Sequence, residues 1–195
     1  MNPYALAAMI AVASYFLGAI SPASLIARTR GIDLHDAGSG NPGATNAARS
    51  MGRKVGVLVG LVDIAKGFVP AAFASIVWGL EFGMIAGVAA VLGHITSPFL
   101  RFRGGKGVAT GIGAILGTQP VWAVPVLLVF VVTYLLTKRV GLASVAASLA
   151  LIPVSLLAWN AGSPGYVVVF GTVLAALIVG RHHRNLAEAF GSGRS

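Results

Sequence analysis

Apolar residues run along most of this chain in seven stretches that short polar segments separate. Continuous apolar runs of this kind, without the alternation of a half-buried strand, are typical of helices that span a membrane. The pattern predicts spans at residues 4–27, 55–80, 82–100, 108–118, 120–137, 140–159 and 165–180. We therefore expect an all-α integral membrane protein with seven transmembrane helices, forming one polytopic domain over residues 1–195.

The fourth stretch is short for a span. As a helix it would cover only about 18 Å of a hydrocarbon core that is about 30 Å thick. An alternative is one long tilted helix over residues 108–137, interrupted at Thr118, Gln119 and Pro120. Seven crossings place every Lys and Arg from Arg28 to Arg194 on one side, except Lys66 within a span. The positive-inside rule then favours a short fourth span, the N-terminus outside and the C-terminus in the cytoplasm.

The composition agrees with a membrane protein and excludes some kinds of site. Hydrophobic residues make up 56% of the chain and charged residues only 10%, whereas soluble proteins have about 25% charged residues. The net charge of +9 would suggest nucleic-acid binding in a soluble protein. Here basic residues of cytoplasmic loops explain it. The chain has no cysteine, which excludes disulfides and Cys-ligated metals.

The first polar segment, GSGNPGATN at residues 38–46, has the composition of an anion-binding loop. Its glycines permit close backbone approach, and its short side chains donate and accept hydrogen bonds. The residues concerned are Ser39, Gly40, Asn41, Gly43, Thr45 and Asn46. Successive N–H groups can form a nest for an anion, and a helix starting at Ala44 would direct its dipole there, with Arg49 near the face of Asn46. The alternative is a plain turn with Asn and Ser caps.

The second polar segment, RFRGGKG at residues 101–107, surrounds one lysine with glycines. A flexible ammonium flanked by exposed backbone amides suits a phosphate. The candidate residues are Gly104, Gly105, Lys106, Gly107 and the following Thr110. Neither loop has the order of a Walker A motif, so ATP hydrolysis is disfavoured.

A third polar segment, RHHRN at residues 181–185, follows the last apolar stretch and contains His182 and Asn185. With seven crossings it faces the same compartment as the two glycine-rich loops, so the three segments can converge on one site. His182 and His183 would point to different faces of a helix and have no carboxylate beside them, which argues against a metal site.

Asp63, Lys66 and His94 fall within predicted spans. Asp63 and Lys66 are spaced i and i+3, and we expect an internal ion pair that holds helices together. His94 precedes the second loop, and we expect it to be a structural hydrogen-bonding residue near a helix end.

In order and spacing the three segments resemble the cytoplasmic motifs of the bacterial acyl-phosphate:glycerol-3-phosphate acyltransferases, the PlsY family. The likeness rests on GSGNPGATN with Arg49, on GHITSPFLRFRGGKGVATG and on RHHRN. It implies transfer of a fatty acyl group from acyl phosphate to the 1-hydroxyl of glycerol 3-phosphate, giving lysophosphatidic acid and phosphate. It further implies an enzyme of phospholipid biosynthesis in the bacterial inner membrane, with a cytoplasmic site and no cofactor or metal. We expect a monomer that contacts membrane lipids and no nucleic acid.

The resemblance also implies roles for residues. Arg49 and Lys106, with the glycine amides, would bind the phosphates and the developing oxyanion, and Ser39 would position the attacking hydroxyl. The expected substrate-binding residues are Gly40, Asn41, Gly43, Thr45, Asn46, Gly104, Gly105, Gly107, Thr110, His182 and Asn185. Two departures concern the C-terminus, where Glu188 replaces a basic residue and the chain ends as GSGRS without the usual glutamate.

Two other classes compete with an enzyme. A transporter for a phosphorylated metabolite would also use broken helices and cationic inner loops, but the sequence has no matching polar loop on the other side and no internal repeat. A non-catalytic lipid-binding protein leaves the density of Gly, Asn and Thr in these loops unexplained.

Overall fold

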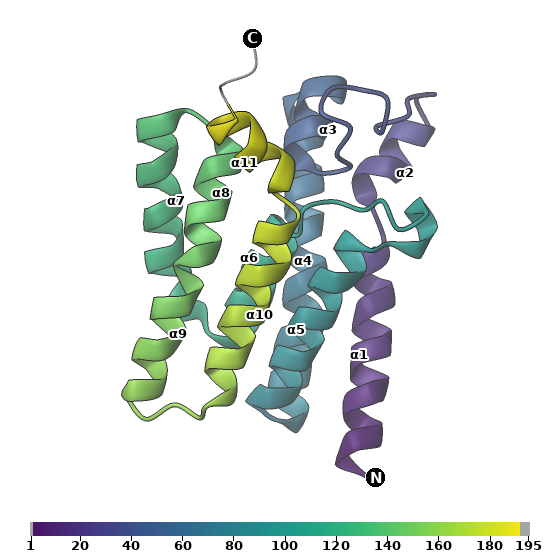
Figure 1. Cartoon of the computed structure of the whole chain (residues 1–195). Helices are drawn as coiled ribbons and strands as arrows, with labels where there is room; N and C mark the ends of the chain where they lie inside the picture. Colours follow the sequence, from purple (N-terminus) through teal and green to yellow (C-terminus); the bar gives the residue numbers. More distant parts are fainter. Residues whose placement is uncertain (1, 192–195) are drawn as a thin grey trace. The chain divides into compact units, whose positions relative to one another are not determined.

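The structure, a computed structural model, describes residues 2–191, and within this range it consists of helices without strands. The chain divides into two compact units, Met1–Thr118 and Gln119–Ser195 (Figure 1). Both glycine-rich loops belong to the first unit, and the RHHRN segment belongs to the second. The single polytopic domain expected over residues 1–195 stays a prediction. Arg194 and the rest of the GSGRS terminus beyond Gly191 lie outside the described residues.

The first unit is built from helices that run along its length and short helices near the polar loops. They are α1 (Pro3–Ala19), α2 (Pro22–Arg28), α3 (Ala44–Met51), α4 (Arg53–Trp78), α5 (Leu80–Ile95), the 3₁₀ turn η1 (Pro98–Leu100) and α6 (Val108–Thr118). In this unit α2 and α3 lie at the end opposite the N-terminus (Figure 1).

The second unit has the same character. Its helices are the 3₁₀ turn η2 (Pro120–Trp122), α7 (Ala123–Thr137), α8 (Val140–Leu149), α9 (Leu151–Asn160), α10 (Tyr166–Gly180) and α11 (His183–Phe190). Within it α7 packs against α8 and α9 packs against α10, while α11 reaches back to α8.

All seven predicted stretches are helical, and the all-α membrane fold is confirmed. Among residues 2–191, five helical segments are long and apolar enough to cross a membrane: Pro3–Arg28, Arg53–Trp78, Leu80–Leu100, Pro120–Thr137 and Val140–Asn160. Val108–Thr118 and Tyr166–Gly180 are apolar but shorter. A continuous helix over residues 108–137 does not form, because α6 ends at Thr118 and a 3₁₀ turn precedes α7. Seven crossings and the orientation stay predictions.

The first predicted span differs from expectation because it is two helices rather than one. Ile20 and Ser21 have extended backbone angles between α1 and α2, and Pro22 occupies the first helical position of α2. Proline disfavours a helical conformation in the residue before it and donates no backbone hydrogen bond. Ser21 caps the new helix by accepting the N–H of Ser24 at 3.2 Å.

Glycines allow the helices of the first unit to approach closely. A Cβ added at Gly67 of α4 would collide with the carbonyl of Thr110 in α6, and one added at Gly18 of α1 would collide with the carbonyl of Ala90 in α5. Small residues at such crossings are characteristic of membrane helices, whose association depends on close packing.

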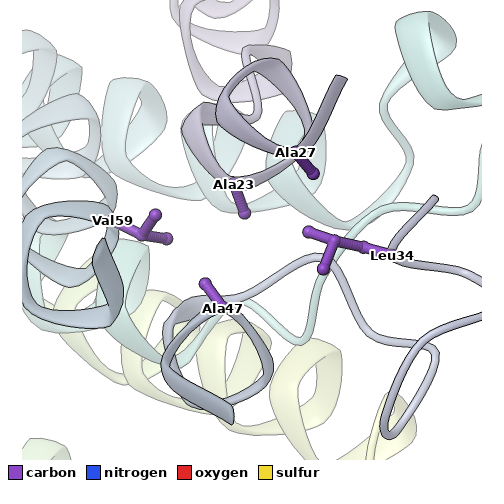
Figure 2. Packing of buried hydrophobic residues seen from close by; sticks show 5 residues of the cluster. All are labelled: Ala23, Ala27, Leu34, Ala47 and Val59. Atoms are coloured by element: carbon purple, nitrogen blue, oxygen red, sulfur yellow. The ribbon is translucent and has the colours of Figure 1, made fainter. Parts of the chain in front are cut away.

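An apolar cluster fixes α2, α3 and the start of the first loop against α4. It consists of Ala23, Ala27, Leu34, Ala47 and Val59 (Figure 2). Leu34 comes from the segment between α2 and α3, points toward Ala27 and Ala47, and is only 2% exposed. Burial of a leucine side chain contributes about 1.5–3 kcal/mol. The polar loop that follows therefore starts from a fixed point.

Candidate active site

The first polar loop is organised around Asn46. This side chain is buried, and its Oδ1 accepts the backbone N–H of Ser39 at 2.8 Å. Its Nδ2 donates to the carbonyls of Ala37 at 2.9 Å and Leu34 at 3.4 Å. Gly38 adopts a φ of 62°, and a Cβ there would collide with the Asn46 amide. Asn46 thus holds the loop in shape, and the protein itself occupies both ends of its amide.

Other side chains of this loop face outward. Ser39, Thr45 and Arg49 are exposed, and Asn41 is half-buried. Gly43 is the N-cap of α3 and provides no side chain to accept from the first turn. The first N–H groups of α3 therefore lie at the positive end of its dipole, where Thr45 has its hydroxyl, while Arg49 lies in the last turn of the helix.

The second loop uses two of its glycines differently from expectation. The N–H of Gly104 donates to the carbonyl of Ile95 at 3.1 Å, and the N–H of Gly105 donates to the carbonyl of His94 at 3.0 Å. Both glycines are buried. The expectation that these two amides are exposed is wrong, because they satisfy carbonyls at the end of α5 that no further helical turn would reach.

Lys106 is half-buried and is separated from the start of α6 at Val108 only by Gly107. Gly107, with a φ of 83°, turns the chain into this helix. Thr110 is completely buried, and its backbone packs on Gly67 of α4. Thr110 therefore lies in the contact between α4 and α6, not on the exposed side of the loop.

The two loops are joined by His35, which the sequence analysis missed. Its Nε2 donates to the carbonyl of Arg103 at 2.9 Å, while its Nδ1 lies 3.3 Å from Asp33 Oδ1. The backbone N–H of His35 also donates to Asp33 at 2.9 Å and, with smaller effects of the imidazole and Arg103, holds the pKa of Asp33 below its ordinary value. A Cβ at Gly40 would lie 3.0 Å from the His35 carbonyl, so this glycine packs on the same turn.

Both loops lead into helices that start against α4. Ala44, at the start of α3, faces Gly60, while Thr110 in the first turn of α6 packs on Gly67. These glycines are two helical turns apart on α4, a rise of about 10 Å. Helix N-termini favour anions, and Lys106 adds a positive charge. This end of the first unit thus suits phosphate-bearing ligands.

The third segment lies in the second unit, at the junction of α10 and α11. His182 is 2% exposed, and its Nδ1 donates to the carbonyl of Ile178 at 2.8 Å. His183 is exposed, so the prediction that the two histidines face different ways is confirmed. Asn185 is half-buried, and a Cβ at Gly141 of α8 would lie 2.6 Å from its Nδ2.

The predicted ion pair within α4 is confirmed, with Lys66 Nζ 2.9 Å from Asp63 Oδ1. His94 is buried beside it, in agreement with a structural role. Within residues 2–191, no group of three or more His, Cys, Asp and Glu side chains is arranged to hold a metal ion.

The structure brings the first two motifs together in one unit and places the third in the other.

The chain is similar to proteins described as glycerol-3-phosphate acyltransferases. Residues 8–191 match the family model described as glycerol-3-phosphate acyltransferase. The chain is 39% identical over 182 residues to the glycerol-3-phosphate acyltransferase of Aquifex aeolicus, with 92% of this chain and 93% of the relative covered. It is 42% identical over 189 residues to that of Pseudomonas paraeruginosa, with 93% and 95% covered.

Two crystal structures have a similar fold. Both are of PlsY (YgiH), an integral membrane glycerol 3-phosphate acyltransferase. The glycerol 3-phosphate form has a TM-score of 0.87 at 38% identity and covers 96% of this chain and 94% of its own. The lysophosphatidic acid form has a TM-score of 0.84 with the same identity and coverage.

Proposed function

Because the chain belongs to the glycerol-3-phosphate acyltransferase family, we propose that it transfers a fatty acyl group from acyl phosphate to the 1-hydroxyl of glycerol 3-phosphate. The products are lysophosphatidic acid and inorganic phosphate. The names of the two similar crystal structures, a glycerol 3-phosphate form and a lysophosphatidic acid form, support this acceptor and this product. The acyl-phosphate donor rests on the resemblance of the three motifs.

The observation that carries the proposal is the joining of two phosphate-suited loops by His35. The first loop exposes Ser39, Thr45 and Arg49 on a backbone that Asn46 holds in place. Both substrates carry a phosphate, and charge-assisted hydrogen bonds from a guanidinium, an ammonium and helix amides are the groups that bind it. We assign Arg49 and Lys106 to the phosphates and to the oxyanion that develops.

The reaction needs orientation and charge stabilisation more than a strong nucleophile. The oxygen of the 1-hydroxyl attacks the acyl carbonyl carbon and forms the ester bond. The bond from this carbon to the phosphate oxygen breaks, and inorganic phosphate leaves with the electron pair. Holding the two substrates together and stabilising negative charge on the carbonyl oxygen are effects that commonly contribute several kcal/mol each. Ser39 positions the hydroxyl, and a phosphate oxygen of the substrate accepts its proton.

Residues from both units take part in this proposal. In the first unit Gly40, Asn41, Gly43 and Thr45 form the substrate side of the first loop, and Gly107 directs Lys106 toward it. On the resemblance of the third motif alone, we also assign His182 and Asn185 of the second unit to substrate binding.

Phosphate release from purified protein tests the reaction. Palmitoyl phosphate is supplied in detergent with and without glycerol 3-phosphate, and coenzyme A and metal ions are omitted. We expect release that depends on glycerol 3-phosphate and is matched mole for mole by lysophosphatidic acid. Labelled acyl retained on the protein without acceptor would replace the direct transfer by an acyl-Ser39 intermediate. A folded sample without release, and with uptake of glycerol 3-phosphate into proteoliposomes, would identify a transporter.

We further propose that the protein lies in the bacterial cytoplasmic membrane with this site facing the cytoplasm. The basic loops support this orientation through the positive-inside rule. A protease-cleavable tag at the C-terminus should be protected from protease added outside sealed cells, whereas the same tag at the N-terminus should be cleaved. Equal protection at both ends would contradict seven crossings.

A further inference from the structure

Three buried ionisable side chains form a group that contacts the second loop through His94. Asp63 and Lys66 come from α4 and His94 from α5, and their side chains are 2%, 5% and 6% exposed. One oxygen of Asp63 lies 2.9 Å from Lys66 Nζ and 3.5 Å from His94 Nδ1. The carboxylate is thus held between an ammonium and an imidazole.

The opposite edge of the His94 ring faces the glycine loop. Gly105 packs so closely on Nε2 that an added Cβ would collide with the ring. The N–H of Gly105 also donates to the His94 carbonyl at 3.0 Å. The next residue along the chain is Lys106. The imidazole therefore fills the space between a fixed carboxylate and the backbone that carries this lysine.

We propose that His94 is a positioning residue for acyl transfer, which seats the backbone of Gly105 and thereby sets the place of Lys106. This inference rests on the proposed function. Asp63 orients the ring, and Lys66 balances the carboxylate while donating to the carbonyl of Ile20 at 2.7 Å. His94 itself neither touches substrate nor exchanges a proton in the reaction.

The positioning role gives a reason for the buried Asp63–Lys66 ion pair beside His94. A buried ion pair is costly to desolvate and often contributes no more stability than apolar residues of the same volume. A ring that Asp63 orients has one defined position, whereas an apolar side chain would leave the loop above it free to settle in several. A displacement of about 1 Å in a catalytic group costs on the order of a hundredfold in rate.

Two amide substitutions separate the two edges of the ring. His94→Gln keeps an amide group near the position of Nε2 and so keeps the packing support of Gly105. His94→Asn keeps a donor near Nδ1 for Asp63 and removes the support of the loop. We expect kcat of His94→Gln within about fivefold of wild type, and a loss of about 30-fold or more in His94→Asn. Equal activities, or the reverse order, would overturn the proposal.

Coupling to Lys106 distinguishes positioning from a general effect on folding. If His94 acts through Lys106, adding His94→Asn to Lys106→Ala should lower kcat by less than about threefold more. Independent, multiplying losses would overturn the proposal. Since Lys106→Ala must itself lose activity under the proposed function, unchanged turnover in that single variant would refute the function and not only this inference.

Two glycine substitutions provide a second test of the proposal that leaves His94 unchanged. Gly105→Ala forces a methyl group against Nε2 and should lower turnover at least about tenfold in a folded protein. Gly165→Ala is the matched control, since the added Cβ has no neighbour closer than 4.0 Å, and it should retain full turnover. Wild-type turnover of Gly105→Ala would refute the close seat of the loop on the ring.

Discussion

The two glycine-rich loops of the first unit are fixed by opposite means. In the first loop a buried side chain, Asn46, binds backbone groups and leaves the loop's own hydroxyls and guanidinium exposed. In the second loop the backbone of Gly104 and Gly105 binds the end of α5, so the glycines are fixed and Lys106 follows them, while Arg101 and Arg103 are exposed ahead of them. The two glycine-rich loops thus differ in construction: a buried side chain holds the first, whereas in the second the backbone bonds of the glycines place the charge of Lys106.

The largest effect should come from removing that charge. Lys106→Ala should lower kcat about a hundredfold, since loss of one charged contact to the transition state costs about 3 kcal/mol. Thermal unfolding in detergent should stay close to wild type, because the side chain is only half-buried. Steady-state phosphate release measures the change, and turnover near wild type would remove Lys106 from the site.

Disturbing the centre of the first loop should have a smaller effect on turnover and a larger one on stability. Asn46→Ala removes three hydrogen bonds and leaves buried backbone groups without a partner, each at a cost of about 1–3 kcal/mol. We expect turnover to fall about 30-fold and the midpoint of thermal unfolding to drop. Asn46→Asp is the control, because it accepts from Ser39 but cannot donate to Ala37. If the aspartate variant matched wild type, the donated bonds would not hold the loop.

Substitution of Gly38, which packs on the Asn46 amide, should lower activity less than substitution of Asn46. Gly38→Ala places a Cβ against the Asn46 amide at a φ of 62°, and both the collision and the left-handed backbone oppose it. We expect a loss of about tenfold in kcat/KM. Gly180→Ala, where an added Cβ meets nothing within 4 Å, serves as its control and should behave as wild type. Equal behaviour of the two variants would contradict the tight turn at Gly38.

Removing the hydrogen bond that joins the two loops should have the smallest effect on activity. His35→Ala removes one partly exposed hydrogen bond to Arg103, which contributes about 1 kcal/mol, so a loss of about threefold to fivefold is expected. His35→Gln retains a donor near Nε2 and should recover most of the activity. A glutamine variant as slow as the alanine variant would argue that Asp33, not Arg103, is the partner that matters.

The helices could be predicted because segments that span a membrane are continuously apolar in sequence. Each of the seven apolar stretches became helical, and the spacing of Asp63 and Lys66 was sufficient to predict their pairing. The break after Ile20 was missed because hydropathy stays high through it, although Pro22 marked the place. Hydropathy measures the preference for an apolar environment and contains no information on backbone angles.

The candidate site was only partly accessible from sequence. The residue types of the first loop predicted an anion-binding surface, but not that Asn46 turns inward to hold it. His35 escaped notice because its partner is a backbone carbonyl of Arg103, which every residue type would offer equally. The amides of Gly104 and Gly105 were assigned wrongly for a related reason, since their acceptors are decided by where α5 ends.

The interruption between α1 and α2 has a consequence for the charge buried in α4. In a continuous helix the carbonyl of Ile20 would accept the N–H of Ser24, but Ser21 takes that donor instead. The released carbonyl lies 2.7 Å from Lys66 Nζ. Where water is excluded, this oxygen accepts the hydrogen bond from the ammonium that a water molecule would accept at an exposed site. A defect in one helix thus solvates the cation of another.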